Sequence, residues 1–220
     1  MIPLRDVIPS RTTPYITVTI IILNVLAWLF ELALPADVRT VFLQVYGVVP
    51  ADFHATTLIT SMFLHGGWMH VLGNMWYLWI FGDNVEDRLG HGLFIGFYLL
   101  CGIIAALGQI AIDPGSTLPT IGASGAIAGV MGAYFVLYPR SRVLTLIPLI
   151  IFWEIIELPA IVLLGFWFVI QLFSAGTIAV TASTGGGGVA FAAHVAGFVV
   201  GMIGGLLFRK RQVGAWEADY

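Results

Sequence analysis

The chain has 220 residues, of which 59% are hydrophobic and 10% charged, and its mean hydropathy is +0.98. This composition excludes a soluble globular domain, which carries about 25% charged residues, and it excludes a disordered chain. The formal net charge of -3 argues against a nucleic-acid partner, and the single cysteine, Cys101, excludes an intrachain disulfide or a cysteine-rich metal site. A helical membrane protein that crosses the bilayer several times remains.

Six apolar segments approach the length of about 20 residues that a spanning helix needs. The expected spans are, in chain order, Tyr15–Leu34, Met69–Gly82, His91–Ile112, Gly122–Tyr138, Leu158–Phe173 and Val189–Phe208. The fold class is therefore an all-α membrane protein, a bundle of six transmembrane helices. We expect one domain over residues 1–220, with its core at about 15–208 and short tails at 1–14 and 209–220.

Two stretches between the spans need a separate interpretation. Pro35–Trp68 is long for a connection and only moderately polar, so we expect it to lie partly in the membrane interface. Val143–Glu157 is apolar but contains Pro148, and we interpret it as a loop along the membrane ahead of the fifth span. A seventh span over this stretch is the alternative.

The positions of lysine and arginine predict the orientation, because these residues collect on the cytoplasmic side. With six spans and the N-terminus inside, only Arg39 lies outside. The inner segments then hold Arg5, Arg11, Arg88, Arg140, Arg142, Arg209, Lys210 and Arg211. Seven spans would place the basic residues at the two ends of the chain on opposite sides. We therefore expect both termini in the cytoplasm.

Polar side chains inside spans are costly and are candidates for function. The second span carries His70 and Asn74, the fourth begins at Ser124, and the sixth carries His194. These three spans run in the same direction. At 1.5 Å per residue, the four side chains lie within roughly 10 Å of the outer surface. The sequence therefore predicts a polar cluster near one face of the membrane.

Rows of small residues predict which helices pack closely. Ala128 and Gly132 follow Ser124 at spacings of four, and Gly201 follows Gly197 on the sixth span, with Gly205 completing that row. Small residues let two helix backbones approach each other. We expect the fourth and sixth spans to pack together and to bring His194 to Ser124.

The residue types of this cluster suit acyl transfer. A serine hydroxyl becomes nucleophilic when a base such as histidine takes its proton. The resulting oxyanion needs hydrogen-bond donors, and His70 and Asn74 lie four residues apart on one helix face. No buried carboxylate beside Ser124 and His194 is evident, since the nearest outer acid in sequence is Asp113. This favours a dyad over a triad.

Taken singly, these residues also have structural interpretations. Ser124 suits helix packing, and His194 or Asn74 suits a hydrogen bond between helices. His65 suits a tie between loop and helix. A channel or transporter would need polar groups through the whole membrane. A metal site built from His65, His70 and His194 would lack a carboxylate.

In this order along the chain, the motifs resemble those of the rhomboid intramembrane serine proteases. The matching segments are His65-Gly-Gly-Trp-Met-His70-Val-Leu-Gly-Asn74, Val85-Glu-Asp-Arg-Leu-Gly90, Gly122-Ala-Ser124-Gly125 and Ala193-His194-Val-Ala-Gly197. The resemblance covers about Tyr15 to Phe208.

The resemblance implies a role for each matching residue. Ser124 would be the nucleophile and His194 the general base and then acid. The oxyanion would be stabilised by His70, Asn74 and the backbone N–H of Ser124. The supporting or structural positions would be His65, Gly122, Gly125, Glu86, Arg88 and Gly197.

The resemblance also implies a substrate class and a compartment. The family cleaves single-span membrane proteins near the outer face of the bilayer, with no metal and no other cofactor. The compact form suits a bacterial plasma membrane. A catalytically silent relative that binds membrane proteins is the alternative. The sequence specifies neither a particular substrate nor an oligomeric state.

Two positions depart from the family pattern. Many members carry a Trp-Arg pair in the loop after the first span, where this chain has Thr56-Thr57-Leu58. Some members place a tyrosine under the histidine ring, four residues after the nucleophile, where this chain has Ala128. The ring of His194 therefore needs a different packing partner.

Overall fold

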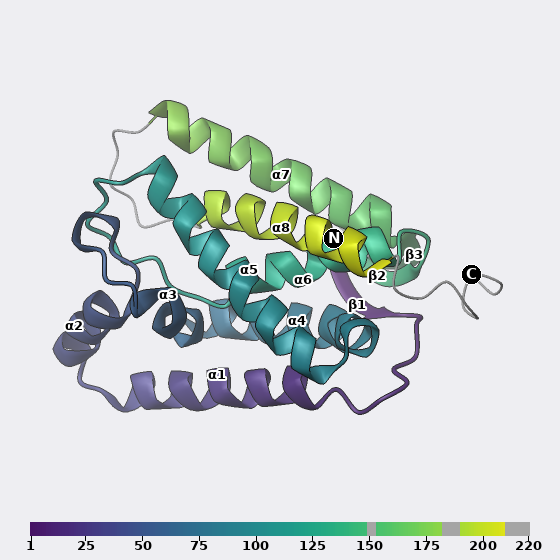
Figure 1. Cartoon of the computed structure of the whole chain (residues 1–220), viewed down its shortest axis with the longest axis horizontal. Coiled ribbons are helices and arrows are strands. Elements are labelled where there is room, and N and C mark those ends of the chain that lie inside the picture. The colour runs from purple at the N-terminus through teal and green to yellow at the C-terminus, as the bar shows by residue number, and fades with distance from the viewer. Residues whose placement is uncertain (149–152, 182–189, 210–220) are drawn as a thin grey trace.

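A computed structural model describes residues 1–148, 153–181 and 190–209, and most of these residues are helical (Figure 1). The helices are α1 (Tyr15–Ala33), α2 (Ala36–Tyr46), α3 (Thr57–Thr60), α4 (Trp68–Leu89), α5 (His91–Ile112), α6 (Ser124–Leu137), α7 (Ala160–Thr181) and α8 (Phe191–Arg209), with short 3₁₀ turns η1 (Pro50–Asp52) and η2 (Ser61–Phe63). The strands are β1 (Ile2–Asp6), β2 (Arg142–Pro148) and β3 (Trp153–Pro159). The predicted C-terminal tail after Arg209 and the predicted start of the sixth span at Val189 lie outside the described residues.

Three helices of the described chain, α1, α5 and α8, are long and apolar enough to cross a membrane. Helix α6 and the Ala160–Gly176 part of α7 are apolar but shorter. The prediction for α5 is confirmed to the residue at both ends. The glycine before it, Gly90, has a φ of 79°, which allows the chain to turn between α4 and α5.

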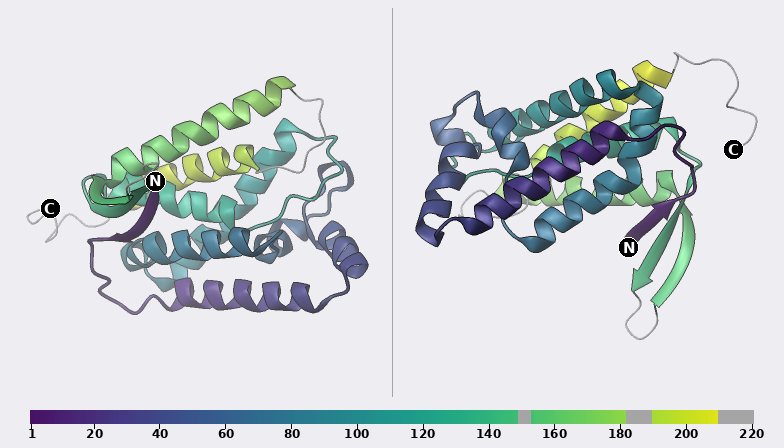
Figure 2. Two further views of the ribbon diagram at one scale, coloured as in Figure 1. Left: turned by 180° about the vertical axis from the view of Figure 1, so that it is seen from behind. Right: turned by 90° about the horizontal axis from the view of Figure 1, so that it is seen from below.

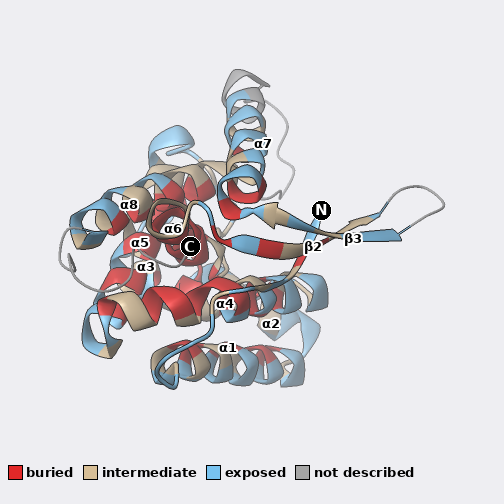
Figure 3. Cartoon of the chain, turned by 90° about the vertical axis from the view of Figure 1, so that its right-hand side faces the viewer, coloured by how far each residue is buried: buried red, intermediate tan, exposed pale blue. Residues whose placement is uncertain are grey.

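Helix α6 lies at the centre of the bundle. All ten residues from Gly125 to Tyr134 are buried, and α4, α5, α7 and α8 pack around them. Figure 3 shows the buried residues gathered around α6, with exposed residues along the outer sides of α1 and α7. A helix that is apolar on every side needs such surroundings. Ser124, the first residue of α6, therefore belongs to a helix that is packed on all sides.

The predicted close packing of α6 against α8 is confirmed. A Cβ on Gly197 would lie 2.1 Å from the Gly125 carbonyl oxygen, and one on Gly201 would lie 1.9 Å from that of Gly129. Only glycine permits these distances. On α6 the close contacts are made by Gly125 and Gly129, each one residue after a predicted position, and by the predicted Gly132, where a Cβ would lie 2.1 Å from the Phe198 carbonyl oxygen.

Residues 149–152 of the predicted loop over Val143–Glu157 lie outside the described residues, and for the rest of this stretch both the loop and a seventh span are wrong. Within the described residues, β2 and β3 pair antiparallel, and β1 pairs antiparallel with β2. The sheet lies at one end of the bundle, and β2 and β3 extend away from the helices (Figure 2). Val143 and Thr145 are buried while their neighbours on β2 are more exposed, as expected for half-buried strands. This three-stranded sheet is an addition to the predicted all-α fold class.

Helix α4 continues beyond its predicted end at Gly82 to Leu89. Glu86 therefore lies in the helix rather than in a loop, and its buried carboxylate accepts the backbone N–H groups of Ile16 and Thr17 at 2.9 and 2.8 Å. These N–H groups lie in the first turn of α1 and have no partner within that helix. Glu86 thus caps α1. Arg88, also helical, donates from Nη2 to the Arg209 carbonyl at 3.1 Å.

The half-buried carboxylate of Asp6 ties β1 to the bundle. It accepts hydrogen bonds from the Tyr134 hydroxyl at 2.7 Å and from Asn84 Nδ2 at 2.9 Å. Burial raises the pKa of Asp6 from 3.8 to about 7; the nearby Asp83 adds to the rise, and the Tyr134 hydrogen bond opposes it. The folded protein therefore holds this proton more tightly than the unfolded chain does.

We expect the contribution of Asp6 to stability to be largest below about pH 4 and to fall as the pH rises to about 7, because folding retains a proton over that window. Melting temperatures of the detergent-solubilised wild type and of Asp6→Asn check this. The wild type should lose stability relative to the variant between pH 4 and pH 8. Parallel pH curves for the two proteins would contradict the assignment.

Candidate active site

Two side chains that are 70 residues apart in the chain meet between α6 and α8. His194 Nε2 lies 2.8 Å from Ser124 Oγ. Ser124 is the first residue of α6, and His194 lies in the first turn of α8. His194 is buried, with 8% of its surface exposed. The predicted meeting of these two residues is confirmed, and its geometry lets the imidazole accept the serine proton.

The other ring nitrogen of His194 contacts α7. Nδ1 donates to Oε1 of the buried Gln171 at 2.7 Å. A neutral histidine that donates from Nδ1 has a lone pair on Nε2, which then accepts the hydroxyl of Ser124. The sequence predicts a Ser-His dyad, and Gln171 was not among the predicted site residues. The only signal was a polar residue within an apolar span.

The ring of His194 packs between aromatic side chains. Trp167 lies with its ring centroid 5.8 Å away at an interplanar angle of 36°, and Phe191 lies 6.5 Å away, edge to face. Trp167 comes from α7, one turn before Gln171. It supplies the packing partner that Ala128 cannot provide.

The side chains of His70 and Asn74 lie next to Gly122, two residues before Ser124. At Gly122 the φ is 118°, and a Cβ there would lie 2.6 Å from His70 Nε2 and 3.6 Å from Asn74 Nδ2. Glycine is required because another side chain would strain the backbone and collide with the imidazole. The Gly66 N–H donates to His70 Nδ1 at 3.3 Å, which leaves Nε2–H as the donor on the side of Gly122. Both predicted oxyanion residues thus face the same short segment.

His65 holds Asn74 in this position. Asn74 Nδ2 donates to His65 Nε2 at 3.0 Å, and one further N–H remains on that amide nitrogen. Burial lowers the pKa of His65 to about 4, and the nearby His70 adds to the fall. His65 is therefore neutral at pH 7 and can accept this hydrogen bond. The sequence interpretation of His65 as a tie between loop and helix agrees with this contact.

Glu31, a buried carboxylate near the end of α1, was not among the predicted site residues. It accepts the backbone N–H of His65 at 3.1 Å. The signal for it was an acidic residue inside the apolar run of the first span. Glu31 anchors the end of the loop that leads to His70, in a chain that lacks the Trp-Arg pair of the family pattern.

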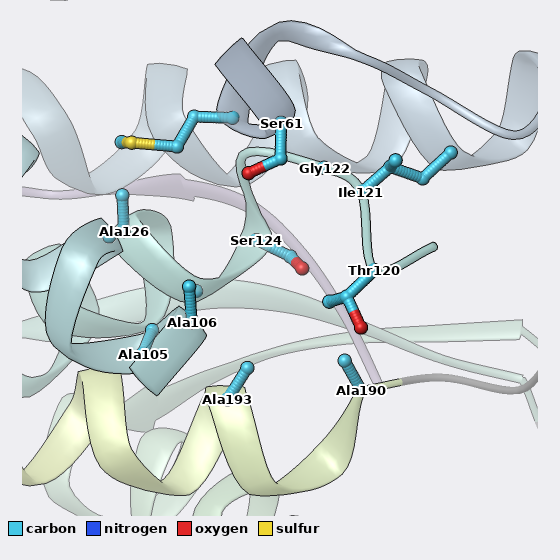
Figure 4. A pocket seen from close by; sticks show the side chains of 13 residues that line it. Ser61, Ala105, Ala106, Thr120, Ile121, Gly122, Ser124, Ala126, Ala190 and Ala193 are labelled. Carbon is cyan, nitrogen blue, oxygen red and sulfur yellow. The ribbon is translucent and has the colours of Figure 1, made fainter. Parts of the chain in front are cut away.

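A small pocket opens beside the Ser124 hydroxyl (Figure 4). Figure 4 shows Ser61 and Ile121 on one side of Ser124 and Ala190 and Ala193 on the other. The Gly122 N–H donates to the Ser61 carbonyl at 2.8 Å, which fixes the loop that forms one wall. Most of the lining side chains are small.

The described residues offer no group of three histidine, cysteine or acidic side chains placed to hold a metal ion. The three histidines of the site, His65, His70 and His194, do not form one ligand set. His65 Nε2 contacts Asn74. His194 contacts Gln171 through Nδ1 and Ser124 through Nε2. Each of these nitrogens already has a protein partner.

Comparison with known proteins identifies relatives of this chain. The chain is 32% identical over 109 residues to "Rhomboid protein 1, mitochondrial" of Saccharomyces cerevisiae, an alignment that covers 47% of this chain and 32% of the yeast protein. It is 40% identical over 76 residues to "Rhomboid protease GluP" of Bacillus subtilis, covering 34% of this chain and 14% of that protein. The chain thus spans well under two thirds of these relatives.

The sequence pattern of the Rhomboid domain matches residues 52–211, a region that contains every residue of the site except Glu31. Membership of this family and the long apolar helices identify an integral membrane protein. The chain belongs to the rhomboid family.

Proposed function

We propose that this chain is an intramembrane serine endopeptidase. The observation that carries the proposal is the 2.8 Å contact between Ser124 Oγ and His194 Nε2, with Nδ1 of the same ring donating to Gln171. A helix-packing serine would not need a histidine of defined tautomer. Relatives such as the GluP protease of Bacillus subtilis support the same chemistry.

In the proposed reaction, Ser124 Oγ attacks the carbonyl carbon of a substrate peptide bond while its proton moves to His194 Nε2. The oxyanion accepts hydrogen bonds from His70 Nε2–H, Asn74 Nδ2–H and the Ser124 backbone N–H, which has no partner within α6 because it lies at the helix start. The C–N bond then breaks as His194 returns the proton to the leaving amine. Water hydrolyses the acyl-enzyme with His194 again as base and releases Ser124.

We further propose that six helices span the membrane, α1 and α4 to α8, with both termini in the cytoplasm. In this arrangement eight of the nine lysine and arginine residues lie inside. The starts of α4, α6 and α8 then place the site near the outer face. The substrates are single-span membrane proteins, and the compartment is a bacterial plasma membrane. A substrate must unwind locally, because a helical peptide bond is shielded from attack.

The test is cleavage of a panel of labelled single-span substrates by the purified protein in liposomes, with and without EDTA. We expect cleavage that EDTA does not change and that Ser124→Ala removes. A fluorophosphonate probe should label Ser124 in the wild type. Cleavage that survives Ser124→Ala would overturn the serine mechanism. No cleavage together with no labelling would identify a silent relative that binds membrane proteins.

Asn74→Ala is expected to lower kcat by about 10²–10³-fold, the usual loss when one oxyanion donor is removed. KM should change little, because the oxyanion forms only after the substrate has bound. Steady-state kinetics in liposomes measure both constants. Asn24→Ala is the matched control, since Asn24 is also buried but its Nδ2 bonds within α1 to the Ile20 carbonyl. Equal kcat values for the two variants would remove Asn74 from the oxyanion site.

A further inference from the structure

Helix α7 contributes two side chains to the surroundings of His194. Trp167 and Gln171 are four residues apart and therefore lie on the same face of α7. Trp167 packs on the imidazole ring, and Gln171 Oε1 accepts the Nδ1 proton at 2.7 Å. No other hydrogen bond of the described residues reaches Nδ1.

We infer that Trp167 and Gln171 are positioning residues that hold His194 in the tautomer and orientation needed to activate Ser124, so that catalysis requires α7 to be docked on α8. This inference rests on the proposed function. Gln171 acts through His194 and does not contact the substrate carbonyl in this assignment.

The hydrogen bond to Gln171 Oε1 fits the reactive tautomer. If the proton were on Nε2, His194 could not accept the Ser124 hydroxyl, and the Gln171 amide would have to turn and donate its NH₂ to Nδ1. With the proton on Nδ1, both contacts are satisfied. An amide oxygen is neutral, so it stabilises the imidazolium less than a carboxylate would. Its removal should therefore cost less than the loss of an acidic residue from a Ser-His-Asp triad.

Trp167 restricts the tilt of the ring. Its contact and that of Phe191 come from different elements, so the imidazole is confined between α7 and the start of α8. Phe168, the next residue on α7, stacks on Phe198 of α8 with a centroid distance of 4.6 Å. Phe168 therefore packs α7 on α8, and among the ring contacts of the described residues it has none with the imidazole, which makes it a matched control for Trp167.

The test compares kcat and KM of five proteins in liposomes: the wild type, Gln171→Leu, Gln171→Glu, Trp167→Leu and Phe168→Leu. We expect Gln171→Leu to lower kcat about 10- to 100-fold, because a buried donor loses its acceptor, while KM stays within about twofold. Gln171→Glu keeps an acceptor and should restore most of the lost kcat. Trp167→Leu should lower kcat more than Phe168→Leu.

The rate of fluorophosphonate labelling at Ser124 gives a second readout that needs no substrate binding, and it should follow kcat across the series. Melting temperatures separate slow catalysis from unfolding. The inference is overturned if Gln171→Leu keeps kcat within twofold of the wild type, or if Gln171→Glu is folded and as slow as Gln171→Leu. An active wild type with either result would leave the proposed function standing. A wild type without cleavage or labelling would overturn both.

Discussion

Replacing Ser124 or His194 with alanine is expected to lower kcat by about 10⁶-fold, to the limit of detection, without unfolding the protein. Serine proteases lose activity on this scale when either member of the nucleophile–base pair is removed, because the remaining member has no separate path to the acyl-enzyme. Both side chains lie at helix starts rather than in the centre of the core, so their truncation leaves the α6–α8 packing intact. The measurement is kcat in liposomes with melting temperature as the check on folding.

The double variant Ser124→Ala, His194→Ala is expected to be no slower than either single variant. Groups that act as one unit are strongly non-additive, since the first deletion already removes the shared step. Additive losses, or a His194→Ala variant that keeps a tenth of the wild-type kcat, would contradict a Ser124–His194 pair at 2.8 Å. The fluorophosphonate probe should label neither single variant.

The sequence was sufficient to predict those features of the site that depend on the spacing of residues along one helix. His70 and Asn74 share a face because they are four residues apart, and in the structure that face meets Gly122. The glycines of α8 predicted close contact with α6 because few other reasons place small residues every fourth position in an apolar helix. These are local rules, and they need no knowledge of how distant helices are oriented.

The contacts of Gln171 and Glu31 could not be predicted, because no row of small residues indicates which neighbour each side chain faces. Gln171 and His194 are 23 residues apart, and nothing in the chain between them sets which face of α7 turns toward α8. Glu31 contacts a backbone N–H at His65, and backbone partners leave no side-chain pattern to recognise. In the sequence, Gln171 and Glu31 differ from their neighbours only in being polar residues within apolar segments.

The hairpin of β2 and β3 shows a different limit. Its residues are as apolar as those of a loop that lies along the membrane, so average hydropathy does not distinguish a β-hairpin from such a loop. The alternation of burial along Arg142–Pro148 identifies a strand. The β-branched residues Val143, Thr145 and Ile147 recur at every second position, which favours this conformation, but the stretch is short enough for either interpretation.

Gly197→Ala is expected to separate α6 from α8 and to lower both stability and activity. The new Cβ would lie 2.1 Å from the Gly125 carbonyl oxygen, which is backbone and has no rotamer to change. Overpacking of this kind costs about 1–3 kcal/mol and sometimes more. Gly125 follows the nucleophile directly, and Gly197 lies one turn after His194. A shift of about 1 Å between the two helices therefore lengthens the Ser124–His194 contact and lowers kcat by about 10²-fold.

Gly96→Ala is the matched control, because Gly96 also lies within a long apolar helix, α5, and a Cβ there would meet no atom within 4 Å. This variant should be as stable as the wild type or slightly more stable, since alanine favours the helix over glycine. Melting temperature and kcat are measured for both variants. If Gly197→Ala matched Gly96→Ala in both quantities, the backbones of α6 and α8 would not be in the contact that brings His194 to Ser124. A loss confined to Gly197→Ala would show that catalysis depends on the closeness of two helix backbones as well as on the identity of the two reacting side chains.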